Sequence, residues 1–314
     1  MTSRRFGGRL GRIALLALCL ASTGAGAEDG AVLTGTLQAI RQRGAVRIGY
    51  RESAPPFAFL NKAGQPVGFS LDLCRGIAAD IASALNRDLL QPGAADWEQG
   101  IRTVLVPVAA DARLPKLVSG EIDLECGSTT ATEQRARTVA FSPVFFLAGT
   151  KLMVPGDSSV ASYRDLAGKT VVVGAGTTNA EVVHRLSAQT TPPFTVTEVP
   201  NLSAAYATLA AGRAAAFASD DILLSGLLVM QPDSQRFRIV GDYLSYEPYA
   251  IALRRDDPSF SGLVRQSFER MAREGTLAAL YDRWLTQPLP TGAALNLPMS
   301  PHLAEMYRAL GSPD

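Results

Sequence analysis

Strand-like and helix-like segments alternate along most of the chain, and this alternation restricts the fold more than any other feature. Short runs rich in β-branched and apolar residues are followed by segments with apolar residues at helical spacing. Such alternation is typical of βαβ units around largely parallel sheets. The sequence therefore predicts an α/β fold. The predicted strands include residues 45–50, 102–108, 122–125, 170–173, 194–199 and 214–218.

Two of the strand-to-helix turns carry the same polar pattern. Thr130 and Glu133 have the spacing of a capping box behind a short strand, and Thr178 and Glu181 repeat it behind another. Most capping boxes only start helices. The free N–H groups of a first helical turn, together with hydroxyls, also suit a small anion such as a carboxylate. The two turns favour one ligand held between two lobes.

The first 27 residues have the composition of an export signal. Four arginines precede the apolar run Ile13 to Leu20, and Ala25-Gly26-Ala27 offers a small-x-small cleavage site. The sequence therefore predicts a signal peptide over residues 1–27, a mature chain beginning at Glu28 and export from the cytoplasm.

Composition excludes some partners. The formal net charge is only +1, and the basic residues are scattered, so nothing favours binding to nucleic acid or a membrane surface. A chain of 314 residues with 47% hydrophobic residues is long enough for one large domain or two lobes.

Two cysteines, Cys74 and Cys126, remain after removal of the predicted signal peptide. An exported chain enters a compartment that permits disulfides, so the two can be bridged. The alternative is that both are small buried hydrophobes, Cys74 on an amphipathic helix and Cys126 at a strand end. The sequence leaves both possibilities open.

Signatures of catalysis, metals and cofactors are scarce. The chain has two histidines, His184 and His302, too few for a histidine-centred triad or metal cluster. Gly174-Ala-Gly176 lacks the third glycine of a dinucleotide site and the lysine of a phosphate-binding loop. We therefore expect no enzyme, no metal and no cofactor.

Charged residues follow several predicted strands. Arg51 follows the first strand, and Arg113 follows the strand at 102–108. Both are candidates to face a ligand, and the alternative is a surface ion pair or a cap. Asp220 and Asp221 precede a helix, so one is expected to cap it, and the other is available to an ammonium group.

Several motifs occur together, in one order, between about Leu37 and Leu310. They are Gly49-Tyr-Arg-Glu-Ser with Pro56-Phe57, Glu125-Cys-Gly-Ser-Thr-Thr130 with Arg135, Gly176-Thr-Thr178, Gly212-Arg-Ala214 with Phe217 and Asp220-Asp221, and Arg283-Trp284. In this the chain resembles the polar amino-acid group of periplasmic solute-binding proteins that serve ATP-driven ABC importers. The resemblance is closest to the glutamate/aspartate-binding members.

The resemblance implies a two-lobed periplasmic-binding-protein fold with a double-crossover hinge and a ligand cleft between the lobes. Residues 28–145 and 246–314 would form lobe 1, and residues 146–245 lobe 2. Such a protein is a non-enzymatic receptor. It captures an amino acid by hinge closure, acts as a monomer, and presents the ligand to a membrane permease.

The family's α-amino and α-carboxylate contacts map onto four residues. Arg135, with Ser128 and Thr130, would hold the α-carboxylate, since guanidinium suits it geometrically. Asp220, helped by Ser128, would take the α-ammonium group.

The side-chain carboxylate of an acidic ligand would meet Arg51 and Arg113. Thr178 of the second lobe, with Thr177 beside it, would close over the ligand. Two positions depart from the acidic-ligand pattern. Ala110 stands where a serine is expected, and Asn201 or Leu202 stands where a histidine is expected.

These residues predict glutamate or aspartate as the ligand. Two alternatives stay open: a binder of another polar amino acid or small dicarboxylate, and a periplasmic enzyme similar to the cyclohexadienyl dehydratases. In the enzyme, Glu52 or Glu125 would be the general acid.

Overall fold

Two β-sheets form the framework of the chain. The structure is a computed structural model that describes residues 1–2, 33–91, 100–290 and 292–312, so the predicted signal peptide and its cleavage site lie outside it except for the first two residues. Within these ranges a six-stranded sheet has the order β5-β6-β1-β7-β16-β8, and a five-stranded sheet has the order β12-β11-β13-β10-β14. We call the parts built on these sheets the first and second lobes.

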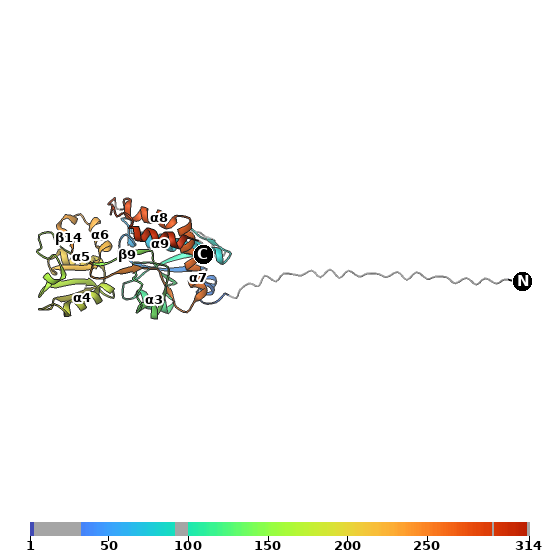
Figure 1. Ribbon diagram of the computed structural model, residues 1–314, viewed down its shortest axis with the longest axis horizontal. Helices are drawn as coiled ribbons and strands as arrows, with labels where there is room; N and C mark the ends of the chain where they lie inside the picture. The colour runs from blue at the N-terminus through green and yellow to red at the C-terminus, as the bar shows by residue number, and fades with distance from the viewer. Residues whose placement is uncertain (3–32, 92–99, 291, 313–314) are drawn as a thin grey trace. The chain divides into compact units, whose positions relative to one another are not determined.

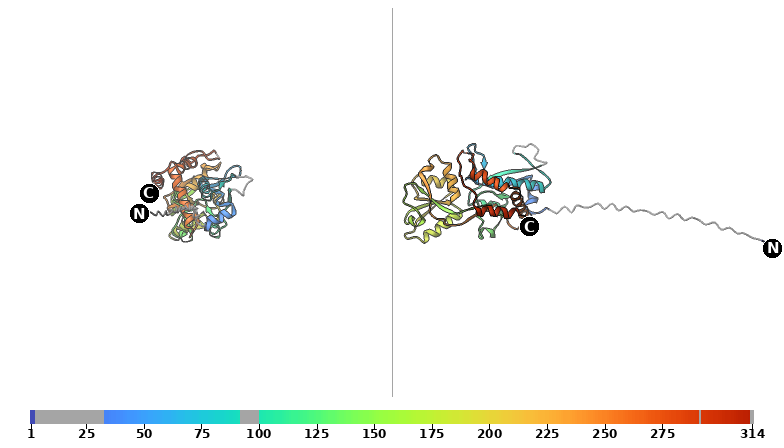
Figure 2. Two further views of the ribbon diagram at one scale, coloured as in Figure 1. Left: turned by 90° about the vertical axis from the view of Figure 1, so that its right-hand side faces the viewer. Right: turned by 45° about the horizontal axis from the view of Figure 1, so that its top comes forward.

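The first sheet is parallel at its centre, since β1 pairs in parallel with β6 and β7, whereas β16 runs antiparallel to β7 and β8. Its strands are β1 (Ala45–Tyr50), β5 (Asp88–Leu89), β6 (Gly100–Pro107), β7 (Leu124–Glu125), β8 (Val139–Phe141) and β16 (Ala252–Arg254). Its helices are α1 (Gly35–Arg43), α2 (Phe69–Ala84), α3 (Arg113–Ser119), α7 (Pro258–Arg273), α8 (Thr276–Tyr281) and α9 (Pro301–Gly311). The C-terminal α9 packs on α7 and α8 (Figure 2).

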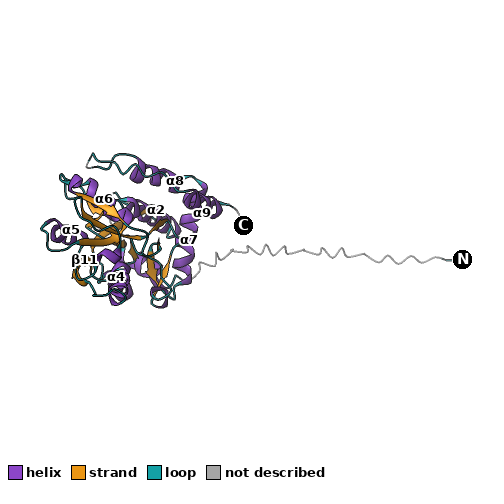
Figure 3. Cartoon of the chain, turned by 60° about the vertical axis from the view of Figure 1, so that its left-hand side comes forward, coloured by secondary structure: helices purple, strands orange, loops and turns teal. Residues whose placement is uncertain are grey.

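The second sheet pairs β11 in parallel with β12 and β13, and β10 runs antiparallel to β13 and β14. Its strands are β10 (Thr150–Pro155), β11 (Thr170–Gly174), β12 (Thr195–Val199), β13 (Ala216–Asp220) and β14 (Phe237–Val240). Its helices are α4 (Thr178–Ala188), α5 (Leu202–Ala210) and α6 (Asp221–Val229). Helices α4 and α5 both contact β11 (Figures 1 and 3). The predicted α/β class is confirmed.

A two-stranded ribbon connects the sheets. The chain leaves the first sheet after β8 through β9 (Phe146–Ala148) and returns after β14 through β15 (Glu247–Tyr249), and the two strands pair antiparallel. This is the double crossover that the resemblance implies. The exact lobe limits at 145 and 245 stay a prediction.

One predicted strand is divided. The sequence predicts a single strand over 249–254, but β15 ends at Tyr249 and β16 begins at Ala252. Between them the Ala250 amide donates to the Thr129 carbonyl at 3.0 Å, and the Ile251 amide donates to the Ser142 hydroxyl at 3.0 Å. The strand therefore changes partners as it passes from the ribbon into the first sheet.

Aromatic side chains fill the space beside the ribbon. Phe57 is fully buried, and its ring centroid lies 5.0 Å from those of both Phe146 and Tyr249. Phe69 and Phe145 pack edge to face next to it, with centroids 5.6 Å apart. The segment after β1 is thereby anchored to the crossing strands.

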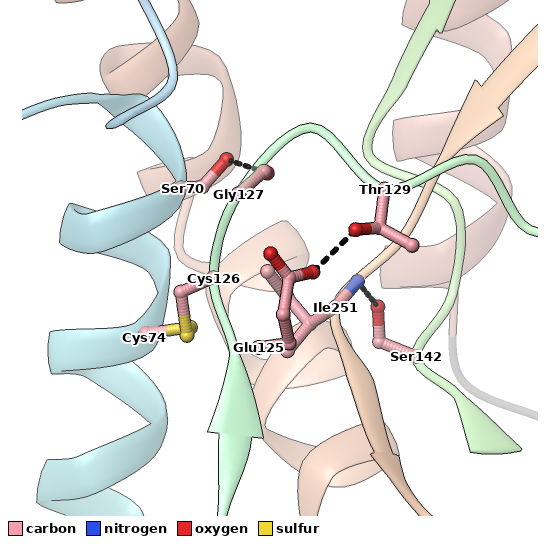
Figure 4. The surroundings of a disulfide bond; sticks show 8 residues. All are labelled: Ser70, Cys74, Glu125, Cys126, Gly127, Thr129, Ser142 and Ile251. Carbon is pink, nitrogen blue, oxygen red and sulfur yellow. Dashed lines mark hydrogen bonds between the residues drawn. A yellow bond between two sulfur atoms is a disulfide. The ribbon is translucent and has the colours of Figure 1, made fainter. Parts of the chain in front are cut away.

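Cys74 and Cys126 form a disulfide, with their Cα atoms 6.3 Å apart. The bond joins α2 to the segment that follows β7 (Figure 4). Nearby, the Ser70 hydroxyl donates to the Gly127 carbonyl at 2.7 Å. Gly68 holds the cap position of α2, and no side chain caps that helix. Ser70 instead braces the glycine turn.

None of the helices in the described ranges has the length and apolar character needed to span a membrane.

Candidate ligand-binding site

The predicted site residues come from strand ends and helix starts of both sheets. Arg51 follows β1, Arg113 begins α3 after β6, and Ser128 follows β7. Since β1, β6 and β7 are parallel neighbours, these side chains start from one edge of the first sheet. From the second sheet, Thr178 begins α4 and Asp220 ends β13.

Arg51 and Arg113 are buried cations. Their exposed fractions are 5% and 3%, and neither guanidinium makes a hydrogen bond or ion pair with a described residue. Burial, followed by repulsion from Arg113, lowers the pKa of Arg51 to about 10. The alternative roles of surface ion pair or cap are therefore wrong. A buried charge without a partner costs several kcal/mol, so both side chains are suited to an anion.

Arg135 lies close to the same charges. It is half-buried, and its Nη1 donates to the Thr130 carbonyl at 3.0 Å. Burial and then repulsion from Arg113 lower its pKa to about 10. Three guanidinium groups, from Arg51, Arg113 and Arg135, thus share one region of the first lobe.

Glu247, which the sequence reasoning missed, links residues of both lobes. It is 2% exposed on β15. Its Oε2 accepts hydrogen bonds of 2.6 Å from the hydroxyls of both Thr130 and Thr178, and its Oε1 accepts one of 2.5 Å from Ser245. The sequence holds a signal for it, because Glu247 is an acidic residue two positions before the apolar run at 249–253.

The helix expected after the first capping box is absent from the described chain. Only a single 3-10 turn, Arg135–Arg137, follows. Thr130 is held extended instead, because it forms a bridge with Tyr249 and its hydroxyl is engaged by Glu247. Glu133 is exposed and closes no box. The tertiary contacts of this segment with β15 therefore override its local helix signal.

The second predicted capping box, Thr178 with Glu181, does not form. The cap of α4 is Thr177, whose hydroxyl accepts from the Ala180 amide at 3.2 Å. This leaves the Thr178 hydroxyl free to point at Glu247. Thr177 therefore has a structural task, and Thr178 is the one of the pair that reaches the polar residues of the first lobe. Its Oγ1 lies 3.4 Å from that of Thr130.

Asp220 is a buried carboxylate with an unusual pKa. Its Oδ1 accepts from Asn179 Nδ2 at 2.7 Å, and its Oδ2 accepts from the Tyr249 hydroxyl. Burial, followed by repulsion from Glu247, raises its pKa to about 7. A ligand ammonium would offset both effects. Asn179, itself 3% exposed, was also missed from the sequence.

The prediction that Asp220 or Asp221 caps α6 is wrong. Asp220 occupies the cap position but makes no capping hydrogen bond. The carboxylate of Asp221 instead accepts from the Gly149 amide at 3.3 Å and from the Tyr243 hydroxyl at 2.8 Å. Asp221 therefore ties α6 to the crossing region, and Asp220 keeps acceptor capacity for a ligand.

The positions that depart from the acidic-ligand pattern are buried apolar residues or, at Asn201, a side chain already engaged in a helix cap. Ala110 and Leu202 are buried, with exposed fractions of 4% and 3%. The Asn201 side-chain oxygen caps α5 by accepting from the Ala204 amide at 2.9 Å. Ser128 is 6% exposed, and its hydroxyl makes no hydrogen bond with a described residue.

Glu125 adds a further buried charge. It is fully buried, its Oε2 accepts from the Thr129 hydroxyl, and its Oε1 has no partner among the described residues. A Cβ atom at Gly127 would lie 2.6 Å from Glu125 Oε1 and 3.2 Å from Arg51 Cγ, so the carboxylate lies beside Arg51. Among the residues that the structure describes, no group of three His, Cys, Asp or Glu side chains is arranged to hold a metal ion.

This arrangement is suited to binding a charged ligand. Three cationic groups approach from the first lobe, and one buried carboxylate, Asp220, lies at the end of a second-lobe strand. A zwitterion that carries an additional negative charge is complementary to it.

Known proteins share both the sequence and the fold. The glutamate/aspartate import solute-binding protein of Salmonella typhimurium is 33% identical over 298 residues, which cover 95% of this chain and 94% of that protein. Among solved structures, a mutant of ArgBP from T. maritima superposes with a TM-score of 0.69 at 28% identity, covering 80% of this chain and 99% of that one.

A second solved structure is the ancestral amino acid-binding protein AncCDT-1, a precursor of cyclohexadienyl dehydratase. Its TM-score is 0.66 at 26% identity, covering 80% of this chain and 99% of that one. Residues 46–287 match the family model described as bacterial extracellular solute-binding proteins, family 3. The chain belongs to family 3 of the bacterial extracellular solute-binding proteins.

Proposed function

We propose that this protein is the periplasmic substrate-binding subunit of an ABC importer and that its ligand is an acidic amino acid, glutamate or aspartate. It closes on the ligand by hinge motion about β9 and β15, acts as a monomer, and delivers the ligand to a membrane permease. Hinge closure around a ligand is a general property of periplasmic binding proteins. The ligand favours closure because both lobes touch it only then.

The proposed acidic specificity is supported by the burial of Arg51 and Arg113, which have no hydrogen-bond or ion-pair partner among the described residues. One cation, Arg135, is sufficient for the α-carboxylate that every amino acid has. Two further buried guanidinium groups are costly unless an anion pairs with them. The side-chain carboxylate of glutamate or aspartate supplies that anion. The name of the Salmonella relative points to the same ligands.

The remaining contacts follow from polarity. Arg135, with Ser128, takes the α-carboxylate, and Asp220 takes the α-ammonium group. Thr130 and Thr178 both donate their hydroxyl protons to Glu247. A ligand carboxylate bound by either threonine therefore requires that hydroxyl to turn from Glu247 to the ligand.

Isothermal titration calorimetry of the chain without residues 1–27 tests this function. We expect L-glutamate or L-aspartate to bind at least about tenfold more tightly than L-glutamine, a difference of about 1.4 kcal/mol. Equal affinity for the acidic and amide ligands, or binding of L-arginine alone, would contradict acidic specificity.

Two substitutions separate the arginine roles. Arg135→Ala is expected to abolish binding of every amino acid, whereas Arg113→Ala is expected mainly to remove the preference for acidic side chains. Arg137→Ala is the matched control, since Arg137 is exposed two residues from Arg135. If Arg113→Ala weakened acidic and neutral ligands equally, this division of roles would be wrong.

A catalytic function is the alternative from another class. The unpartnered Oε1 of Glu125 is the observation that favours it, because a dehydratase needs a general acid beside its substrate. We infer instead that Glu125 holds the Thr129 hydroxyl in the turn after β7. Incubation with prephenate or arogenate discriminates the two, and formation of an aromatic product that Glu125→Gln abolishes would establish the enzyme.

A further inference from the structure

Helix α6 contains a glycine in its interior that its backbone does not require. Gly226 lies in the middle of Asp221–Val229, and its φ is outside the left-handed region. Glycine inside a helix costs about 1 kcal/mol relative to alanine. A spatial reason must therefore favour it.

That reason is a backbone of the first lobe. A Cβ atom at Gly226 would lie 2.3 Å from the carbonyl oxygen of Pro55 and 2.8 Å from its carbonyl carbon. Pro55 directly follows β2 (Ser53–Ala54), which pairs with β3 (Ala58–Leu60). The contact therefore joins the segment that carries Arg51 to the helix that starts after Asp220.

Neither side of this contact can move away easily. The Pro55 turn is closed by the Phe57 amide donating to the Ala54 carbonyl at 3.0 Å, and the Pro56 carbonyl accepts from Phe69 at 2.9 Å. On the other side, α6 is anchored by apolar residues that are almost fully buried. These are Ile222, Leu223, Leu224 and Leu227.

A second glycine makes a similar approach elsewhere. A Cβ atom at Gly176 would lie 2.6 Å from the Cα atom of Asp111. Asp111 is two residues before Arg113, and Gly176 is two residues before Thr178. This position also has φ of +67°, which by itself favours glycine. Gly176 is therefore a second close approach between the two lobes. Only at Gly226 is the close approach the sole reason for a glycine, so Gly226 is the position to test.

We propose that Gly226 is a positioning residue for ligand binding: its missing side chain lets the Arg51 segment and the Asp220 helix approach closely enough to hold one ligand. The inference rests on the proposed receptor function but not on which amino acid is bound. It identifies the face where α6 meets the Pro55 turn as a contact of the closed state.

The test compares Gly226→Ala with Gly262→Ala. Gly262 is also inside a helix, α7, but a Cβ atom there would meet nothing within 4 Å. Calorimetry uses L-glutamate, or the amino acid that the unmodified chain binds if it is another one. We expect Gly226→Ala to bind at least about tenfold more weakly, the scale of a core overpacking penalty, and Gly262→Ala to bind as the unmodified chain does.

Small-angle X-ray scattering at saturating ligand gives a readout that a merely structural role would not move. Gly226→Ala is expected to stay more extended than Gly262→Ala under the same conditions. Equal affinity of the two variants would overturn the inference while leaving the receptor function intact. Loss of the cooperative unfolding transition in Gly226→Ala would also overturn it, since Gly226 would then serve folding. If the unmodified chain bound no amino acid, the proposed function itself would fail.

Discussion

The Thr178 hydroxyl at the start of α4 donates to Glu247 Oε2 on the crossing strand β15, over 2.6 Å. The same oxygen accepts from Thr130 of the first lobe. One buried carboxylate in the connecting ribbon therefore orders a hydroxyl from each lobe.

Glu247→Ala is expected to lower the free energy of unfolding by about 1–3 kcal/mol, since three hydroxyls lose their buried acceptor. Glu247→Gln should lose less, because its amide oxygen still accepts. Urea denaturation measures both. Glu305→Ala is the control, since the Glu305 side chain is 68% exposed. An effect of Glu247→Ala no larger than that of the control would show that the hydroxyls find other acceptors.

Asp220 is expected to make stability depend on pH. Its pKa is raised to about 7 from 3.8, so the stability it contributes is fully present below about pH 4 and is lost as the pH rises through about 7. Asp220→Asn removes this loss, which amounts to about 4 kcal/mol at most. Urea denaturation at pH 5 and pH 8 checks it, with Asp242→Asn, an exposed position, as the control. Identical pH dependence in both variants would contradict the role of Asp220.

The same carboxyl group is expected to couple ligand binding to protons. An ammonium group favours ionised Asp220, so binding between about pH 5 and pH 7 should release a proton, and affinity should fall as the pH falls below about 7. Calorimetry in buffers of different ionisation enthalpy measures the released proton. An affinity that stays constant from pH 8 to pH 5 would argue against an ammonium contact with Asp220.

Arg51→Met is expected to make the protein more stable and to abolish acidic-ligand binding. Burial and then repulsion from Arg113 lower the pKa of Arg51 to about 10 from 12.5, so its charge is destabilised, and an apolar side chain of similar length removes that cost, about 1–3 kcal/mol. Thermal unfolding and calorimetry measure the two effects. The control is Arg308→Met, since the Arg308 side chain is 70% exposed. Lower stability than the control would mean that Arg51 has a structural partner.

Loss of the disulfide is expected to cost stability without changing ligand specificity. Cys74 and Cys126 are 52 positions apart, and a crosslink over such a loop contributes about 4 kcal/mol in the chain-entropy model. The double variant Cys74→Ala/Cys126→Ala should therefore unfold at a lower temperature than the oxidised protein. Reductant should lower the unfolding temperature of the unmodified protein and leave that of the variant unchanged. Two titratable thiols in the native, non-reduced protein would contradict the bond.

Local signals predicted most elements because they act over a few residues. The sequence predicts a short helix over 114–118 ended by Gly120, and the structure has α3, Arg113–Ser119, with Gly120 at φ +80°. It also predicts a last helix over 302–310, and the structure has α9, which Ser300 caps by accepting from the Leu303 amide at 3.2 Å. Both ends are set by a turn conformation or a cap that the adjacent residues supply.

Predictions failed where distant segments compete for the same groups. The capping box at Thr130 is sound locally, yet Glu247, 117 positions away, takes its hydroxyl, and pairing with Tyr249 keeps its backbone extended. Asp220 likewise looks like a helix cap in the sequence, but Asn179 and Tyr249 bind its carboxylate.

The sequence by itself determined the α/β class, the order of the elements and the residues that carry charge at the strand ends, because period, propensity and motif order are properties of neighbouring residues. Only the tertiary structure decided which of those charges are buried without a partner, that Glu247 holds a hydroxyl from each lobe, and that Gly226 must lack a side chain. Burial, desolvation and close approach depend on segments far apart in the chain, and no local pattern records them.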